Sequence, residues 1–460
     1  MPADSSKSSS VAPKTTTPSS AAARAASLRR STTCSPTTSA PATAASATVT
    51  SSWRPSAKRA AGATPITANR TFRSSTLTTP PSSACGCRRT RRFSPASSEQ
   101  RRRPVRPRQA GRSQHMDEKL RFGLIGCGGQ GRYLSEALSL TKQADFAACA
   151  DLDLERAATA AQQCGYRETF GSAAEMLSNT DLDAVIVATI HDQLQPCGLA
   201  VVEAGKHLFI EKPMALTAAD GQRLVDAARA KNVKVMVGYT LPFLSTRRKL
   251  RQLLDEGAVG ELAHVFAGQL IGGMGGWLGQ PEHGGGPLFY IGTHVLYEVL
   301  DVVRRKAERV YAEVTLTDAG VDRECLFTVR FEGGVVAQSA TSQRLGGRYG
   351  WIDVLGSAGR VRSEWESPDV FVQSTAIPAY RQETLIRVPD ESVGPKVALG
   401  DKASVTGFKY VRAWAEEFAD FLAAIREDRD PAVTGEDGVR VLEITDAVFE
   451  SGRTGLPVAL

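Results

Sequence analysis

A glycine turn near residue 126 has the residue types and the spacing to bind a dinucleotide. Gly126, Gly128 and Gly131 match the pattern G-x-G-x-x-G, and Gln130 belongs to the same turn. In this pattern the first glycine permits a tight turn, the second lets the backbone approach a pyrophosphate, and the third lets the next helix pack closely on the strand. The free N–H groups at the start of that helix then face the phosphates. The motif alone is weak, because glycine turns with this spacing also arise by chance.

An acidic residue follows at the distance that the motif requires. Residues 146–151 have the composition of a strand ending in Asp151, which lies 25 positions after Gly126. A carboxylate there accepts hydrogen bonds from the ribose 2′-hydroxyl and repels a 2′-phosphate, so it predicts NAD rather than NADP. The alternative is that Asp151 is only a strand-end residue or an N-cap of the next helix, with Asp153 continuing the cap. If NADP bound more tightly, Arg156 would be the first candidate for the phosphate contact.

Strands and helices alternate up to about residue 243, which predicts a parallel sheet covered by helices on both faces. We expect strands at 120–125, 146–151, 182–188, 207–210 and 233–238, and helices at 132–141, 193–204 and 217–231. Ligands of such sheets bind at the carboxyl ends of the strands. Thr189, Glu211, Lys212 and Pro213 lie at those ends, so we predict that they contribute to the cofactor site.

The pattern changes after about residue 244, where strands dominate. We expect strands at 261–271, 308–317, 323–331, 334–342, 350–356, 359–364 and 384–388, and helices at 244–256, 290–303, 407–427 and 436–452. Turn signals such as Gly333-Gly334 favour antiparallel pairing. This predicts an α+β region with an open, largely antiparallel sheet.

The first 115 residues differ from the rest in composition. They hold 20 of the 56 Lys and Arg but only two of the 49 Asp and Glu, and they are rich in Ser, Thr, Ala and Pro. Such a segment cannot bury enough apolar surface to offset chain entropy, so we expect residues 1–115 to be disordered. It is a transit peptide, a basic tail, or the product of a start assigned upstream of a natural one at Met116. We favour the last interpretation.

The net charge of +7 arises entirely in this first quarter, so it does not indicate a nucleic-acid partner. Eight cysteines without paired spacing are typical of free thiols in a reducing compartment, and no metal site is expected. No apolar run approaches the roughly 18 residues that span a membrane. We expect a cytoplasmic protein, or an organellar one if residues 1–115 are a transit peptide.

From residue 116 to 460 the chain resembles the Gfo/Idh/MocA oxidoreductases, the family of glucose–fructose oxidoreductase and inositol dehydrogenase. The resemblance rests on the glycine turn with Asp151 and on three further segments: Ala204-Gly205-Lys206-His207 with Glu211-Lys212-Pro213, Glu256-Gly257-Ala258-Val259-Gly260-Glu261, and Val433-Thr434-Gly435-Glu436-Asp437-Gly438. It implies an NAD(P)-binding Rossmann domain over 116–243 and a C-terminal α/β domain over 244–460. The open sheet face of that second domain commonly mediates homo-oligomers in the family.

The resemblance also implies a catalytic lysine. In the family the lysine of the E-K-P run lies beside the nicotinamide and the substrate hydroxyl, and Lys212 matches it. A cation there stabilises the alkoxide charge that develops on the substrate. The alternative is a solvated lysine at a strand end. Pro213 shapes the turn, and in this family the bond before it is often cis.

The second catalytic segment of the family departs from its usual pattern here. Of D-x-G-x-H-x-x-D, Gly292 and His294 are kept, but Tyr290 and Tyr297 replace the aspartates. On a helix, residues 290, 294 and 297 share one face, so all three are expected at one site. His294 suits a base for the hydroxyl proton, and Tyr290 beside Lys212 could donate a hydrogen bond or transfer a proton. The alternative is that both tyrosines pack under the sheet and His294 makes a hydrogen bond in the core.

Two further segments leave alternatives open. Where the family has T-P-x-x-x-H, this chain has Thr189-Ile190-His191-Asp192-Gln193-Leu194, and His191 either substitutes for the missing histidine or is exposed. The glycine-rich start of residues 272–288 is typical either of a substrate lid or of a plain connection.

These observations predict an NAD-dependent oxidoreductase that transfers a hydride between the cofactor and a hydroxyl of a sugar, inositol or related polyol. Lys212 and His294 would handle the oxygen and its proton. Two alternatives stay open because the aspartates are replaced. One is a glycosidase that retains its NAD, and the other is a non-catalytic protein that senses NAD or a sugar.

Overall fold

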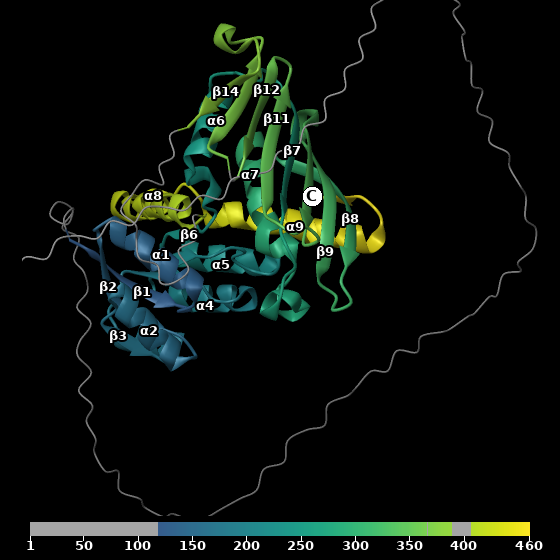
Figure 1. Ribbon diagram of the computed structural model, residues 1–460. Coiled ribbons are helices and arrows are strands. Elements are labelled where there is room, and N and C mark those ends of the chain that lie inside the picture. The colour runs from purple at the N-terminus through teal and green to yellow at the C-terminus, as the bar shows by residue number, and fades with distance from the viewer. Residues whose placement is uncertain (1–117, 366, 389–405) are drawn as a thin grey trace, which may run out of the picture. The chain divides into compact units, whose positions relative to one another are not determined.

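The computed structural model describes residues 118–365, 367–388 and 406–460. The expectations for residues 1–115 fall outside these ranges. All described residues belong to one compact unit, Arg103–Leu460, which contains two sheets (Figure 1).

The first sheet has six parallel strands in the order β3-β2-β1-β4-β5-β6. Its strands are β1 (Leu120–Ile125), β2 (Ala144–Ala150), β3 (Glu168–Phe170), β4 (Ala184–Val187), β5 (His207–Ile210) and β6 (Val235–Val237). The connecting helices are α1 (Gly129–Leu140), α2 (Leu154–Cys164), α3 (Ala173–Asn179), α4 (His191–Glu203) and α5 (Ala218–Lys231). The parallel sheet expected from the alternating pattern is confirmed. The helices α2 and α3 and the short edge strand β3 were not predicted, because polar and largely exposed segments give little apolar periodicity.

Local signals set the ends of several of these helices. Thr217 is the N-cap of α5 as predicted, and its hydroxyl accepts a hydrogen bond from the Asp220 N–H at 3.1 Å. Gly205 follows α4 with a φ of +71°, a left-handed conformation that glycine adopts without strain. The order of strands places the carboxyl ends of β1, β4 and β5 side by side.

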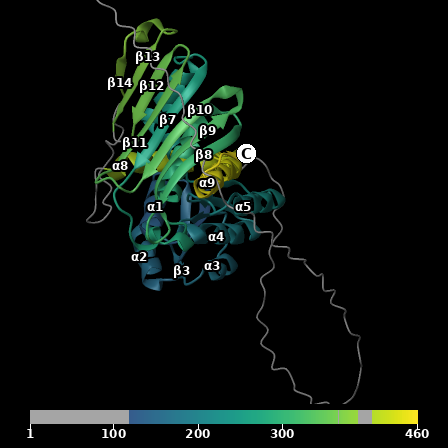
Figure 2. The same ribbon diagram turned by 90° about the vertical axis from the view of Figure 1, so that its right-hand side faces the viewer.

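The second sheet has nine strands in the order β14-β13-β12-β11-β7-β10-β9-β8-β15, and Figure 2 shows most of them side by side. Its strands are β7 (Leu262–Leu270), β8 (Ala307–Leu316), β9 (Asp322–Phe331), β10 (Val336–Ser342), β11 (Tyr349–Gly356), β12 (Gly359–Glu364), β13 (Asp369–Ser374), β14 (Thr384–Arg387) and β15 (Val458–Ala459). Among these described strands only β7 and β10 pair in parallel, so the largely antiparallel sheet is confirmed. The strands β13 and β15 were not predicted.

Four helices accompany this second sheet in the chain. They are α6 (Ser245–Asp255), α7 (Thr293–Val303), α8 (Thr406–Glu427) and α9 (Gly435–Thr454). Helix α9 contacts β8 of the second sheet and α5 of the first, as Figure 1 shows. Helix α8 instead packs on the first sheet, where the ring of Phe418 lies 4.4 Å from that of Phe209 on β5. Residues late in the chain therefore complete the core of the first sheet.

The run Val433-Thr434-Gly435-Glu436-Asp437-Gly438 starts α9. Thr434 and Asp437 form a capping box, in which each side chain accepts a hydrogen bond from the backbone N–H of the other. A Cβ added at Gly438 would lie 2.7 Å from the sulfur of Met214, which directly follows the E-K-P turn. The start of α9 therefore packs closely against the segment that follows the turn with Lys212.

Candidate active site

Each of the three motif glycines stands where the backbone geometry or the space around it favours glycine. Gly126 has a φ of +91°, and a Cβ there would lie 2.6 Å from the carbonyl oxygen of Ala188. A Cβ at Gly131 would overlap the carbonyl oxygen of Gly126, so its absence lets α1 pack against the turn. No atom lies within 4 Å of the place where a Cβ of Gly128 would stand. Open space at Gly128 beside an N-terminus that no side chain caps leaves a cradle that fits a pyrophosphate.

Asp151 directly follows β2 and is tied to the glycine turn. Its carboxylate accepts hydrogen bonds at 2.9 Å from the N–H of Cys127 and from the N–H of Asp153. The N-cap of α2 is Asp153, so the interpretation of Asp151 as the cap is wrong. Arg156 forms ion pairs at 3.2 Å with both Asp151 and Asp153. Arg156 is therefore already neutralised by two carboxylates.

A cavity of about 520 Å³ opens beside this turn. It is lined by Gln130, Tyr133, Ala188, Thr189, His191, Glu211, Lys212, Gly238, Thr240, Leu241, Gln269, Trp277, Leu278, Tyr290, Ile291, His294, Arg348, Trp365, Tyr410 and Trp414. The first sheet contributes the residues that follow β4, β5 and β6, and the second sheet contributes β7 and the segments before α7 and β11. The predicted residues Gln130, Thr189, Glu211, Lys212, Tyr290 and His294 thus meet in one cavity.

Lys212 is the buried cation of this cavity. Its ammonium donates a hydrogen bond to the carbonyl oxygen of Tyr290 at 2.6 Å and lies 4.9 Å from the centre of the Tyr290 ring. Only 8% of the residue is exposed, so the interpretation of a solvated lysine is wrong. Burial lowers the pKa of Lys212 to about 8, with a smaller contribution from the charge of Arg348 and against the attraction of Glu211. An amine with a pKa near neutrality can both take up and release a proton.

Glu211 connects Lys212 to the glycine turn. Its carboxylate accepts a hydrogen bond from the amide of Gln130 at 2.7 Å and another from the N–H of Lys212 at 3.1 Å. Burial raises the pKa of Glu211, while the charge of Lys212 opposes that shift. The bond between Lys212 and Pro213 is cis, and Pro213 is buried but does not line the cavity. Glu211 therefore links the start of α1 to the end of β5.

His294 lies at the cavity wall on the first turn of α7. The residue is half-buried, and loss of solvation together with the charges of Lys212 and Arg348 lowers its pKa well below the usual value. The ring is therefore neutral at neutral pH. Its Nδ1 has no hydrogen-bond partner among the described residues, so the expected core hydrogen bond at this atom is not found. A buried ring nitrogen without a partner, facing a cavity, is suited to bind a ligand hydroxyl.

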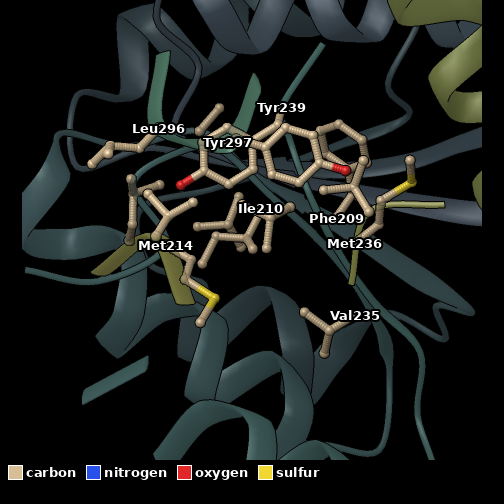
Figure 3. Packing of buried hydrophobic residues seen from close by; sticks show 14 of the residues in the cluster. Phe209, Ile210, Met214, Val235, Met236, Tyr239, Leu296 and Tyr297 are labelled. Carbon is tan, nitrogen blue, oxygen red and sulfur yellow. The ribbon is translucent and has the colours of Figure 1, made fainter. Parts of the chain in front are cut away.

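Tyr297 does not join Tyr290 and His294, so the expectation that all three side chains meet at one site is wrong. Its ring stacks on that of Tyr239, with centres 4.7 Å apart and planes at 5°, above Phe209 and Ile210 (Figure 3). The physical reason is a π-helical turn, η4 (Leu288–Gly292), which precedes α7. The wider turn changes the angle about the helix axis between the side chains of residues 290 and 297. The two side chains therefore do not lie on one face, as they would in a regular α-helix.

His191 begins α4 and is buried, so the alternative that it is exposed is wrong. Its Nδ1 lies 2.8 Å from the carbonyl oxygen of Gly284, and its ring meets the edge of Trp277 with centres 4.6 Å apart. Burial, with a smaller effect of Lys212, lowers the pKa of His191 to about 3, so it is neutral. Trp277 and Leu278 bring the segment 272–288 into the cavity wall, which favours a substrate-contacting role for that segment over a plain connection.

Several residues of the cavity were missed. Gln269 and Arg348 come from the second sheet, and Thr240 follows β6, where its hydroxyl donates to the buried Glu417 at 3.2 Å and accepts from the indole of Trp414 at 2.9 Å. Gln269 had a detectable signal, since it shares the buried face of β7 with Val265 and Ala267 although it is polar. Nothing in the sequence distinguishes Arg348.

The described part of the chain has no cluster suited to a metal ion. No group of three or more His, Cys, Asp or Glu is arranged there to hold one. None of the described helices has the length and apolar character needed to cross a membrane.

Comparisons with known proteins agree with this geometry. Residues 120–239 match the model of an oxidoreductase family with an NAD-binding Rossmann fold, and residues 247–362 match the GFO/IDH/MocA C-terminal domain. A 1,5-anhydro-D-fructose reductase of Ensifer adhaerens is 29% identical over 73% of this chain and 97% of its own length. A myo-inositol 2-dehydrogenase of Thermotoga maritima is 25% identical over 72% and 96%. A levoglucosan dehydrogenase solved with NADH and L-sorbose has the same fold, with a TM-score of 0.67 and 24% identity over 74% of this chain and 99% of its own.

Proposed function

This chain belongs to the GFO/IDH/MocA oxidoreductase family, and we propose that it is a dehydrogenase that transfers a hydride between NAD and a hydroxyl-bearing carbon of a sugar, inositol or related polyol. The relatives named above act on compounds of this class. The observation that carries the proposal is that Lys212, which follows β5, and His294, on α7, line one cavity together with Gln130 at the start of α1.

The residues present fit a bound NAD. Gly126, Gly128 and Gly131 would hold its pyrophosphate at the start of α1, and Asp151 would bind the adenosine ribose. Thr189, Glu211 and Pro213 complete the proposed cofactor site at the ends of β4 and β5. When bound, NAD supplies the hydride acceptor for alcohol oxidation.

Lys212 is the proposed proton acceptor for the substrate hydroxyl. Its pKa of about 8 leaves part of the protein with a neutral amine at neutral pH, and the same amine, once protonated, returns the proton in the reverse reaction. The carbonyl of Tyr290 fixes its position. The pKa of His294 is too low for an efficient base, so the neutral imidazole orients the hydroxyl by a hydrogen bond instead. The Tyr290 ring beside the ammonium favours its charged form.

The test uses the full chain, NAD and a panel of inositols, aldoses and sugar acids, with the absorbance of the reduced nicotinamide as the signal. We expect turnover, and Lys212→Ala is expected to reduce kcat/KM about 1000-fold, in the range of general acid–base catalysis. Tyr290→Phe is expected to lower kcat/KM about tenfold if its hydroxyl contacts substrate. Tyr297→Phe is the matched control and should leave kcat/KM unchanged, because Tyr297 lies in the core.

The remaining outcomes separate the alternatives. Sugar release without net change of the cofactor would make the protein a glycosidase that retains NAD. NAD binding without turnover on any compound would favour a sensor. Undiminished turnover in Lys212→Ala would remove Lys212 from the chemistry.

We also propose that the protein forms a homo-oligomer through the open face of its second sheet. Phe266, Tyr311 and Leu326 are exposed on three strands of that sheet, whereas their sequence neighbours Val265, Ala312 and Phe327 are buried against the helices. The three residues lie on one face of the sheet, with β10 between β7 and β9, and exposed apolar residues on an open sheet face are typical of a protein interface.

Cytoplasmic location remains our proposal for this chain. The described cysteines Cys127, Cys149, Cys164, Cys197 and Cys325 are all free thiols, which is the usual state in a reducing compartment. Cell fractionation with an antibody would test it.

A further inference from the structure

The cavity carries more positive than negative charge at its substrate side. Among its described lining residues, Lys212 and Arg348 are cationic and Glu211 is the sole carboxylate. Glu211 is already held by the amide of Gln130 and the N–H of Lys212. Both lining histidines are neutral at neutral pH, because their pKa values lie well below it. The excess charge is therefore available to a ligand.

Arg348 supplies part of this charge from the second half of the chain. It lies in the segment between β10 and β11 and lines the same cavity as Lys212 and His294, and its charge lowers the pKa of both groups. Among the described residues, no carboxylate forms an ion pair with Arg348. Arg344, four residues earlier in the same segment, does pair with Glu324 at 3.5 Å. An unpaired guanidinium at a cavity is a ready partner for an anion.

Gln269 offers a second unused group in the same cavity. It is completely buried on β7, and neither its amide nitrogen nor its carbonyl oxygen has a hydrogen-bond partner among the described residues. Buried polar groups are nearly always hydrogen-bonded, so an unpaired amide that lines a cavity indicates a ligand. The amide can both donate to a carboxylate and accept from a hydroxyl.

We propose that the substrate is a sugar acid, and that Arg348 binds its carboxylate while Gln269 hydrogen-bonds to the same molecule. This inference rests on the proposed dehydrogenase function and specifies its substrate class. The planar guanidinium presents two parallel N–H donors that match the two oxygens of a carboxylate. The carboxylate is unchanged in the reaction, which oxidises a CH–OH carbon to a carbonyl by loss of a hydride to NAD and of a proton to Lys212.

The test compares matched compounds in the full chain: glucose, gluconate, glucuronate and glucose 6-phosphate, with myo-inositol as a further neutral polyol. We expect kcat/KM for an acid to exceed that for the neutral sugar about 100-fold, mostly through KM. Arg348→Gln should remove this preference while it leaves the Kd of NADH unchanged. Gln269→Leu should raise KM for the acid. Arg344→Gln is the matched control and should have no effect.

The other outcomes distinguish failure of the sugar-acid inference from failure of the dehydrogenase proposal. Equal use of neutral sugars and acids, unaffected by Arg348→Gln, would overturn it and leave the dehydrogenase intact. Preference for the sugar phosphate would overturn the carboxylate assignment. A weaker Kd for NADH in Arg348→Gln would assign Arg348 to the cofactor. If no compound is turned over, the dehydrogenase proposal fails. The acid site is then tested by calorimetry of gluconate and glucuronate with the NADH-loaded protein. Binding that Arg348→Gln abolishes supports the acid site, and the absence of binding overturns it.

Discussion

Burial sets the chemistry of the basic side chains around the cavity. Lys212, His191 and His294 all lose solvation there, and in each case this disfavours the charged form and lowers the pKa. The ordinary pKa values of lysine and histidine differ, so the lowered values lead to different protonation states at neutral pH. The two imidazoles become neutral hydrogen-bonding groups. The pKa of Lys212 is instead brought close to neutral pH, where the amine can exchange a proton.

The first prediction concerns the pH dependence that follows for alcohol oxidation. Lys212 takes up the hydroxyl proton only when it is neutral, so kcat/KM at saturating NAD should rise with pH and level off near the lowered pKa of about 8. Because the pKa of His294 lies well below 6.5, protonation of this ring should add no second limb between about pH 6 and 7. The check is a pH–rate profile of the wild type and Lys212→Ala. A profile that stays flat from about pH 6 to 9 would contradict this role.

The second prediction concerns cofactor choice at Asp151. Its carboxylate repels a 2′-phosphate, and Arg156 is already paired with Asp151 and Asp153, so we expect NADH to bind at least about tenfold more tightly than NADPH. Asp151→Ser should weaken NADH binding and reduce the preference. Fluorescence titration with both cofactors provides the Kd values. Asp153→Asn serves as control, since it changes a neighbouring acid that caps α2, and tighter NADPH binding by the wild type would refute the assignment.

At the scale of elements, one glycine turn holds three positions with different physical roles. Gly131 is needed for contact between α1 and the turn, and Gly128 borders open space. Gly129 starts the helix, and a Cβ added there would meet no atom within 4 Å. Alanine substitution at Gly131 and at Gly128 therefore distinguishes an effect on packing from an effect on ligand binding.

The third prediction compares alanine at these positions. Gly131→Ala should lower the Tm and weaken NAD binding, since overpacking costs about 1–3 kcal/mol. Gly128→Ala should leave the Tm unchanged but weaken NAD binding about tenfold or more, because its methyl group enters the space proposed for the pyrophosphate. Calorimetric melting and NADH titration give both quantities, and a stability loss in Gly128→Ala with normal binding would contradict the cradle.

The π-helical turn η4 is the second element that decides the site. It separates Tyr290, whose carbonyl accepts a hydrogen bond from Lys212 and whose ring lines the cavity, from Tyr297, which packs on Tyr239. A strictly α-helical spacing predicts a common face for both. The two replaced aspartate positions therefore have unlike environments, and only position 290 can affect substrate directly.

At the scale of the whole molecule, the open face of the second sheet is the surface for which we predict a partner. Gel filtration with light scattering should give a mass that is a multiple of the 49.1 kDa chain. Phe266→Asp with Leu326→Asp should shift the protein toward the monomer, because charges on both strands would be buried without partners in the interface. Leu152→Asp is the control, since Leu152 is 92% exposed and follows β2 of the first sheet. A monomeric wild type at micromolar concentration would contradict the interface.

The sequence by itself determined the features that depend on short spacings. The glycine turn, the strand end at Asp151, the start of α5 at Thr217 and the E-K-P turn each rest on contacts between residues close in the chain, or on a period that local backbone geometry imposes. This is why the parallel first sheet, the antiparallel second sheet and the placing of Lys212 at a strand end followed from the sequence. Edge strands such as β3 did not, because they bury too little apolar surface to show a pattern.

The tertiary structure decided which distant residues meet. Lys212 contacts the backbone of Tyr290, 78 positions away, and Gln269 and Arg348 reach the same cavity from two places in the second sheet. Such contacts depend on how β7, η4 and the segment before β11 are placed relative to β5, and no local periodicity encodes that placement. The low pKa of His294 and the absence of an ion pair at Arg348 among the described residues also arise only from burial and from neighbours that folding brings together.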